Sequence, residues 1–167
     1  MSELAAEEKI LDQLKEQFGD QIMDTEIPRK RRINVHVADP VQRDIIQFGK
    51  EKFNAWHIIA ISGVDVQEHM EVVYAFDIQP PAEDKYAITL NIHVKTDRDT
   101  PNVKTITDMI PGSSFFEREA HDLLGINFDG HPNLDRLILP DDWPKGQYPL
   151  RKDFLLDIQK KEQAGKS

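Results

Sequence analysis

Apolar residues recur at two different spacings along the first part of the chain, and each spacing predicts a different element. Over residues 3–18 they return at near-helical intervals among Glu, Lys and Gln. This run stops at Gly19, which is typical of an amphipathic helix that ends on a glycine cap. Between Ile33 and Val37 the apolar residues alternate with polar ones, which is the period of a half-buried strand. A helix followed by a strand is therefore expected.

A second helix is predicted directly after this strand. Asp39 suits the N-cap position and Pro40 the first helical position, because proline has no backbone N–H to leave unpaired there. Val41, Ile45 and Phe48 then fall on one side of the helix, which predicts that this side faces a core.

Three further strands are predicted from apolar runs over residues 56–64, 71–78 and 86–94. Residues 80–84 have the composition of a turn, so the last two strands are expected to be neighbours. Strand, helix and then three strands with short connections predict an α+β fold: a small, mainly antiparallel or mixed sheet with helices packed on one face.

Near residue 100 a polar break precedes one clear helix, expected over residues 113–125. Ser114 and Glu117 have the spacing of a capping box, in which a hydroxyl and a carboxylate satisfy free backbone N–H groups at the helix start. Gly125 ends the apolar pattern and so predicts the end of the helix. The predicted apolar face consists of Phe116, Ala120, Leu123 and Leu124.

Residues 126–167 are expected to form an extended arm. Prolines and glycines recur between Gly125 and Phe154 and leave little room for regular structure. The arm nevertheless carries too much apolar surface to stay loose in water, so it must lie on its own sheet or on a partner. The chain then divides into an α+β sheet domain (1–112), the helix (113–125) and a partner-binding arm.

Composition narrows the range of functions. The formal net charge of -9 argues against nucleic-acid binding and against direct binding to an anionic membrane surface. The sequence contains no cysteine, so it can supply no thiolate ligand to an iron–sulfur cluster. If the chain belongs to an electron-transfer machine, the redox centres are expected in other subunits.

No segment of the sequence predicts membrane insertion. Purely apolar runs such as residues 58–61 are far shorter than the roughly 20 residues that span a bilayer. The acidic N-terminal region also lacks the basic and apolar blocks of a signal peptide. We therefore expect a cytoplasmic protein that reaches the inner face of a membrane only through partner subunits.

Carboxylates gather in the helix expected over residues 113–125. Glu117, Glu119 and Asp122 lie within two turns, and paired carboxylates can act as acid and base. A structural interpretation explains most of them, however, because Glu117 caps the helix and Arg118 can pair with Asp122 at i,i+4 spacing. We therefore interpret this group as a docking element rather than a catalytic one.

His121, Asp122 and His131 offer a rival interpretation, a stand-alone metal-dependent hydrolase. Imidazole and carboxylate groups are suitable ligands for zinc or iron. Their spacing matches no established ligand pattern, and the residues around His131 have the composition of a tight turn. A hydrogen-bonded turn histidine is the preferred interpretation of His131.

Basic and aromatic residues provide further contact candidates. The run Arg29–Arg32 is interpreted as a solvated sheet edge that discourages strand pairing, with contact to an acidic partner as the second choice. In the arm, Arg136 and Arg151 lie among aspartates and are expected to form ion pairs that become buried at an interface. Trp143 is the best single anchor candidate, although it could instead cover its own sheet.

The helix and the arm carry short motifs in close succession. They are Glu117-Arg118-Glu119, Asp122, Gly125-Ile126, Phe128, Gly130-His131-Pro132, Leu134, Arg136, Leu139-Pro140, Asp142-Trp143 and Pro149-Leu150-Arg151-Lys152-Asp153-Phe154. Together they closely resemble the signature of the thirty-kilodalton subunit of respiratory complex I and of related membrane-bound nickel–iron hydrogenases. His121 and Leu124 replace the aromatic residue and the Phe usual in complex I members, so the chain looks more like the hydrogenase-type branch.

The resemblance implies a non-catalytic, cofactor-free subunit of a membrane-bound, ion-pumping oxidoreductase complex. Such a subunit docks on a large nickel–iron-hydrogenase-like subunit, beside a small iron–sulfur subunit, and these partners hold the clusters and any nickel–iron site. The resemblance assigns partner contacts to the helix and arm. The residues are Glu117, Arg118, Glu119, Asp122, His131, Arg136, Asp142, Trp143, Arg151, Lys152 and Asp153.

Several functions stay open at this level. The electron acceptor could be protons, a quinone-like carrier or a sulfur compound, because that choice is made in the large subunit. A subunit of an NADH- or F420H2-quinone-type oxidoreductase is the alternative within the same class. The metal-dependent hydrolase and a soluble adaptor without redox chemistry are alternatives from other classes.

Overall fold

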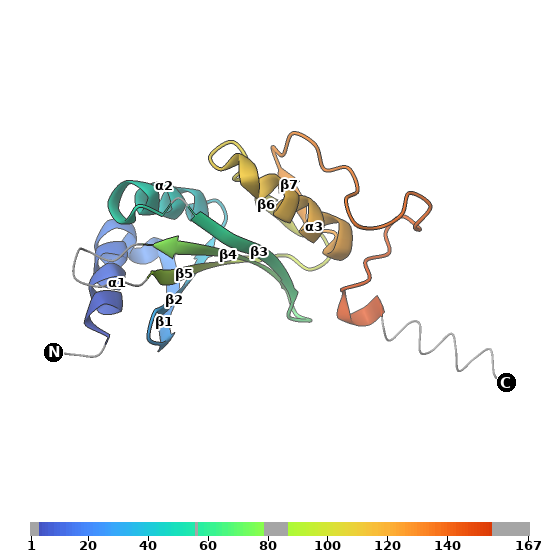
Figure 1. The fold of residues 1–167 in the computed structure, drawn as a ribbon. Helices are drawn as coiled ribbons and strands as arrows, with labels where there is room; N and C mark the ends of the chain where they lie inside the picture. The colour runs from blue at the N-terminus through green and yellow to red at the C-terminus, as the bar shows by residue number, and fades with distance from the viewer. Residues whose placement is uncertain (1–3, 56, 79–86, 155–167) are drawn as a thin grey trace.

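The computed structural model describes residues 4–55, 57–78 and 87–154, and its ordered elements build one sheet, one small strand pair and three α-helices (Figure 1). The α-helices are α1 (Ala5–Phe18), α2 (Val41–Phe53) and α3 (Ser114–Leu124), with short 3-10 helices η1 (Gly19–Gln21) and η2 (Pro111–Ser113). The strands are β1 (Ile22–Arg29), β2 (Arg32–Ala38), β3 (His57–Asp65), β4 (Met70–Ile78), β5 (Ile88–Thr96), β6 (Asn102–Lys104) and β7 (Asn127–Asp129).

The main sheet has the order β1-β2-β5-β4-β3. β2 and β5 pair in parallel, whereas β1 with β2, β3 with β4 and β4 with β5 pair antiparallel. The sheet is thus mixed and mainly antiparallel, which confirms the predicted α+β fold. β4 and β5 are neighbours as predicted, although the turn predicted at residues 80–84 lies outside the described residues.

The core lies between one face of the sheet and the helices. The register places Val35 of β2 beside Ile92 of β5, and Ile92 beside Tyr74 of β4, and all three are fully buried. Residues from α1, α2 and α3 belong to the same buried cluster, so the helices cover one face as expected. The opposite face carries polar residues, including Asn91, whose amide donates a 2.8 Å hydrogen bond to Asn34.

The run Arg29–Arg32 forms the exposed turn that joins β1 and β2, at one end of the edge strand β1, so its effect on the addition of a further strand stays a prediction. The predicted N-cap at Asp39 is wrong. Asp39 makes no N-cap hydrogen bond to α2. Its carboxylate instead accepts a 2.6 Å bond from the Gln42 side chain and a 2.8 Å bond from the backbone N–H of Lys104, so it joins α2 to β6.

The core also extends beyond the expected boundary at residue 112. Ala120 and Leu124 of α3 and Ile126 and Phe128 at the start of the arm are all buried in it. β7 pairs in parallel with β6 and thereby fixes the first residues of the arm beside the sheet domain. Within the described residues, no helix is long and apolar enough to cross a membrane.

Candidate partner interface on helix α3 and the arm

Helix α3 lies closely over the edge strand β3, and a glycine makes this approach possible. A Cβ atom at Gly63 would collide with the Leu124 side chain and touch that of Ile126. Any larger residue at position 63 would therefore force the Leu124 side chain, or α3 with it, to shift. Leu124 and Ile126 are buried, so the inner side of α3 is part of the core.

Glu117 belongs to this inner side and is fully buried. Its carboxylate accepts a 2.9 Å bond from the backbone N–H of Ile106 and bonds from the hydroxyls of Thr105 and Thr107. Burial raises the pKa of the Glu117 carboxyl, against the opposing effect of these donors. The predicted capping box is therefore wrong, and Glu117 is inaccessible to a partner in this structure.

His131 lies in a hydrogen-bonded turn, as predicted. Its backbone N–H donates to the carbonyl of Phe128, and its ring Nδ1 accepts a 3.0 Å bond from the N–H of Asn133. The ring Nε2 lies 3.1 Å from the Ser114 hydroxyl and 4.0 Å from the Glu117 carboxylate. The His131 side chain is buried and connects the arm to the start of α3, so it offers no surface to a partner.

Arg118 and Asp122 do not form the predicted helix ion pair, because each binds the backbone of the arm. The Arg118 guanidinium donates bonds of 2.9 and 2.7 Å to the carbonyls of Asp135 and Arg136. One oxygen of Asp122 accepts three backbone N–H groups, at 3.2, 2.9 and 2.8 Å, from residues 137–139. Burial alone would raise the pKa of Asp122, but the three donors outweigh it and lower this pKa.

A second link, which the sequence did not reveal, ties the end of the arm to the sheet. Asp65, nearly buried at the end of β3, accepts bonds of 3.1 and 2.9 Å from the Arg98 guanidinium. It also accepts a 3.0 Å bond from the backbone N–H of Lys152, and Arg98 reaches Asp153 at 3.4 Å. The Arg98 hydrogen bond holds the pKa of Asp65 well below its usual range.

The two arginines of the arm bind carbonyl oxygens of their own chain rather than aspartates. Arg151 donates a 2.8 Å bond to the carbonyl of Leu124 at the end of α3, and its guanidinium lies 4.9 Å from the centre of the Tyr148 ring. Arg136 donates a 3.0 Å bond to the carbonyl of Pro140. Among the described residues neither arginine forms an ion pair with an aspartate, and the ion pairs expected at a partner interface stay a prediction.

Gly125 is required twice at this junction. It ends α3 with a φ of 75°, in the left-handed region that glycine adopts without strain. A Cβ atom at this position would also collide with the Tyr148 ring, so the arm packs directly on the end of the helix.

Trp143 stabilises the arm itself. Its indole N–H donates a 2.9 Å bond to the carbonyl of Gln147, and its ring lies 6.0 Å from that of Phe154. Trp143 is half-buried, while Asp142 and the side chain of Lys152 are exposed. Of the predicted partner residues, Asp142, Lys152 and Asp153 therefore remain accessible on the arm.

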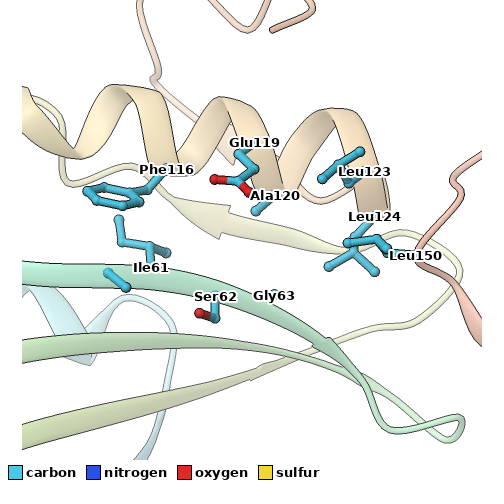
Figure 2. Close-up of a pocket in the computed structure, with 10 residues that line it drawn as sticks. Ile61, Ser62, Gly63, Phe116, Glu119, Ala120, Leu123, Leu124 and Leu150 are labelled. Carbon is cyan, nitrogen blue, oxygen red and sulfur yellow. The ribbon is translucent and has the colours of Figure 1, made fainter. Parts of the chain in front are cut away.

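The outer side of α3 borders an open groove of about 310 Å³ above β3, which we call the α3–β3 groove (Figure 2). Glu119 lies at its rim, is exposed, and has no hydrogen bond or ion pair to any described residue. Leu150 lines the groove and is 59% exposed. Phe115, on α3 outside the groove, is 64% exposed. The groove is lined by Ala60, Ile61, Ser62, Gly63, Phe116, Glu119, Ala120, Leu123, Leu124 and Leu150.

The three residues of the hydrolase alternative serve other contacts. The His121 ring Nδ1 donates a 2.9 Å bond to the carbonyl of Ile126, and Asp122 holds the arm. His131 faces Ser114. Within residues 4–55, 57–78 and 87–154, no group of three or more His, Asp or Glu side chains is arranged to hold a metal ion.

The sequence and the fold both match known proteins. The family described as "Respiratory-chain NADH dehydrogenase, 30 Kd subunit" matches residues 35–160. A subunit of the F(420)H(2) dehydrogenase of Methanosarcina mazei is 29% identical over 145 residues, which cover 87% of this chain and 89% of that protein. Membrane-bound hydrogenase subunit beta of Pyrococcus furiosus is 29% identical over 151 residues, covering 87% and 84% of the two chains.

A solved structure has the same fold. A chain of the membrane-bound sulfane sulfur reductase, an archaeal respiratory membrane complex, superposes with a TM-score of 0.75 and 26% identity, covering 94% of this chain and 91% of its own. Two other relatives are longer proteins, of which this chain spans 58% and 26%. Because the family match includes most of the sheet, α3 and most of the arm, the chain belongs to the family of the 30 Kd subunit of respiratory-chain NADH dehydrogenase.

Proposed function

We propose that this chain is a non-catalytic, cofactor-free peripheral subunit of a membrane-bound oxidoreductase complex, and that it docks on the large catalytic subunit through α3 and the arm. The observation that carries the proposal is the α3–β3 groove. There Glu119, a carboxylate without a partner among the described residues, borders exposed apolar side chains. Exposed apolar surface of this kind marks protein–protein contact sites.

The hydrogen-bonding pattern supports docking over catalysis. Glu117, Arg118 and Asp122 all form hydrogen bonds with groups of their own chain. A general acid or base must instead reach a substrate proton. Arg118 and Asp122 fix the arm on α3, and Glu117 fixes α3 to residues 105–107, which gives the outer surface a defined shape before a partner binds. A preformed surface reduces the ordering cost of association.

The proposed partners are a large nickel–iron-hydrogenase-like subunit and a small iron–sulfur subunit, on the cytoplasmic side of the membrane. The relatives support membership of such a complex, since they are named as parts of a dehydrogenase, a membrane-bound hydrogenase and a sulfur reductase. The iron–sulfur clusters and any nickel–iron site are assigned to those partners. The terminal electron acceptor and the pumped ion are then properties of the partners too.

A charge reversal at Glu119 tests this proposal. Glu119→Arg should reduce the amount of this chain that co-purifies with a tagged large subunit, because the exposed carboxylate is proposed to face a basic partner group. Glu16→Arg is the matched control, since Glu16 is an exposed glutamate on α1. Both variants should melt as the unmodified chain does, because neither glutamate is buried. Equal assembly of both variants at the unmodified level would contradict docking through α3.

A further inference from the structure

The two edges of the main sheet are protected to very different degrees. The edge strand β1 carries Asp24, Glu26, Pro28 and Arg29, and its pairing with β2 is irregular at two places. Charges, proline and irregular pairing are the devices by which soluble proteins prevent a further strand from adding to an edge. This edge is therefore closed to strand addition.

The opposite edge, β3, lacks most of these devices. It is nine residues long, and residues 58–64 include no charged residue and no proline. Its pairing with β4 is irregular at one place, near Ile58. Ile59 is 42% exposed and Val64 is 41% exposed. A long, uncharged and partly apolar edge of this kind is a template for a further strand.

Within the described residues, the outer backbone of β3 is also unoccupied. β3 lies at the end of the strand order and pairs there with β4. In the described part of the chain, no backbone group of residues 57–64 bonds to any segment other than β4. Only the end of the strand is covered, where Asp65 receives the arm through the N–H of Lys152.

The free edge borders the α3–β3 groove. Residues 60–63 of β3 form one wall of the groove, and Phe116, Glu119 and Leu123 of α3 form the other, as Figure 2 shows. Because side chains of a strand point alternately to the two faces of a sheet, a strand added to β3 would direct every second side chain into this groove. Apolar side chains would meet Phe116 and Leu123, and a basic one would meet Glu119.

We propose that the β3 edge binds an extended segment of a partner subunit as an additional strand, with alternating apolar side chains and one Lys or Arg that faces Glu119. Strand addition of this type combines backbone hydrogen bonds with side-chain pockets. The inference rests on the proposed docking function and specifies its binding mode. A second copy of this chain is the less suitable occupant, because its net charge of -9 would be repelled by an equal charge.

A matched pair of edge variants tests the proposal. Ile59→Lys places a charge on the free edge, and Met23→Lys makes the same change on β1, where Met23 is 63% exposed. Ile59→Lys should weaken binding of the chain to a complex depleted of it by about tenfold or more, whereas Met23→Lys should change binding less than about twofold. Equal effects of the two variants would overturn the proposal, provided that thermal melting shows both to be folded.

Amide hydrogen exchange of the unmodified chain provides a test that needs no variant. In the intact complex, the amides of residues 57–64 that do not bond to β4 should exchange about tenfold or more slowly than in the isolated chain, while those of β1 keep their rates. If the surface of α3 and the arm becomes protected but β3 does not, strand addition is wrong and docking stands. If neither becomes protected, both proposals fail. Slowed β3 exchange in an isolated chain that sediments as a dimer would assign the edge to a second copy.

Discussion

The inner and outer sides of α3 each carry a glutamate, but the two glutamates lie in opposite environments. Glu117 faces inward, is fully buried, and has its carboxylate surrounded by three donors. Glu119, two positions later, is exposed at the rim of the α3–β3 groove and has no partner among the described residues. Charged residues that cluster in a sequence motif therefore need not act as a unit. Glu117 stabilises the fold of this chain, whereas Glu119 is accessible to another molecule.

The arm likewise has groups that bind within the chain and groups that are exposed. Its backbone is held by Arg118, Asp122 and Asp65 from within the chain. Its apolar side chains at Leu137, Ile138 and Leu150 remain exposed by 37%, 56% and 59%. The charged groups therefore position the backbone, while apolar surface faces outward. Substitutions can test the inner and outer sides one residue at a time.

The largest loss of stability is expected from Glu117→Ala. Removing the carboxylate leaves the buried N–H of Ile106 unpaired, leaves the hydroxyls of Thr105 and Thr107 only each other and Ser113 as partners, and adds a cavity. Together these changes should cost about 3 kcal/mol or more. Chemical denaturation of the isolated chain measures this loss. Glu117→Gln keeps the shape and an acceptor for Ile106, so it should lose less than about half as much. Equal losses for Ala and Gln would show that the hydrogen bonds contribute little.

A smaller loss is expected from Asp122→Ala, because the donors it leaves belong to the half-exposed arm. The N–H groups of residues 137–139 can be hydrated once the arm detaches, so we expect a cost of about 2 kcal/mol and a local opening. Limited proteolysis should then cut the arm of the variant faster than that of the unmodified chain. Unchanged cleavage would mean that Asp122 does not hold the arm.

Acidification should reduce the stability of the chain by a still smaller amount than Asp122→Ala, because it weakens the contacts that hold the arm. The pKa values of Asp65 and Asp122 are lowered on folding, so each carboxylate stabilises the fold above its unfolded pKa of about 3.9. This contribution is lost as the pH falls through the folded pKa. The melting temperature should fall less steeply below about pH 4 for Asp122→Asn than for the unmodified chain. Parallel curves would contradict this assignment.

The contribution of Glu117 to stability should depend on pH in the opposite direction to that of Asp65 and Asp122. Burial raises its pKa above the unfolded value, so the fold is most stable with this carboxyl protonated and loses that advantage as the pH rises through the folded pKa. The slope of stability against pH just above about 4.3 should therefore differ between the unmodified chain and Glu117→Gln, with the unmodified chain losing more. Chemical denaturation at a series of pH values measures both slopes, and identical slopes would mean that Glu117 does not titrate in this range.

Much of the sheet could be predicted because its strands bury one face. β2, β4 and β5 show regular alternation, and their inward residues are the buried ones. β1 gave no such signal, because it is an edge strand with no residue buried and an irregular register. Edge strands are stabilised by a neighbour more than by their own pattern.

The roles of the charged residues were predicted less well, because their partners are distant in sequence. Ser114 and Glu117 have the spacing of a capping box, but Thr105 and Ile106, more than ten residues earlier, supply the donors that bind Glu117. Asp65 and Lys152 are 87 positions apart, and no local pattern links them. Glu119 was the exception: it lacked a local role in the sequence, and it lacks one in the described structure.

Carboxyl labelling of Glu119 and Glu16, in the isolated chain and in the intact complex, is the decisive test of docking through α3. A water-soluble carbodiimide with an amine should modify both residues in the isolated chain, because both are exposed. In the complex, docking through α3 predicts that labelling of Glu119 falls by about tenfold or more while Glu16 keeps its rate. Labelling of Glu119 at the same rate in the complex as in the isolated chain would show that the outer side of α3 faces solvent, and it would contradict the proposed interface.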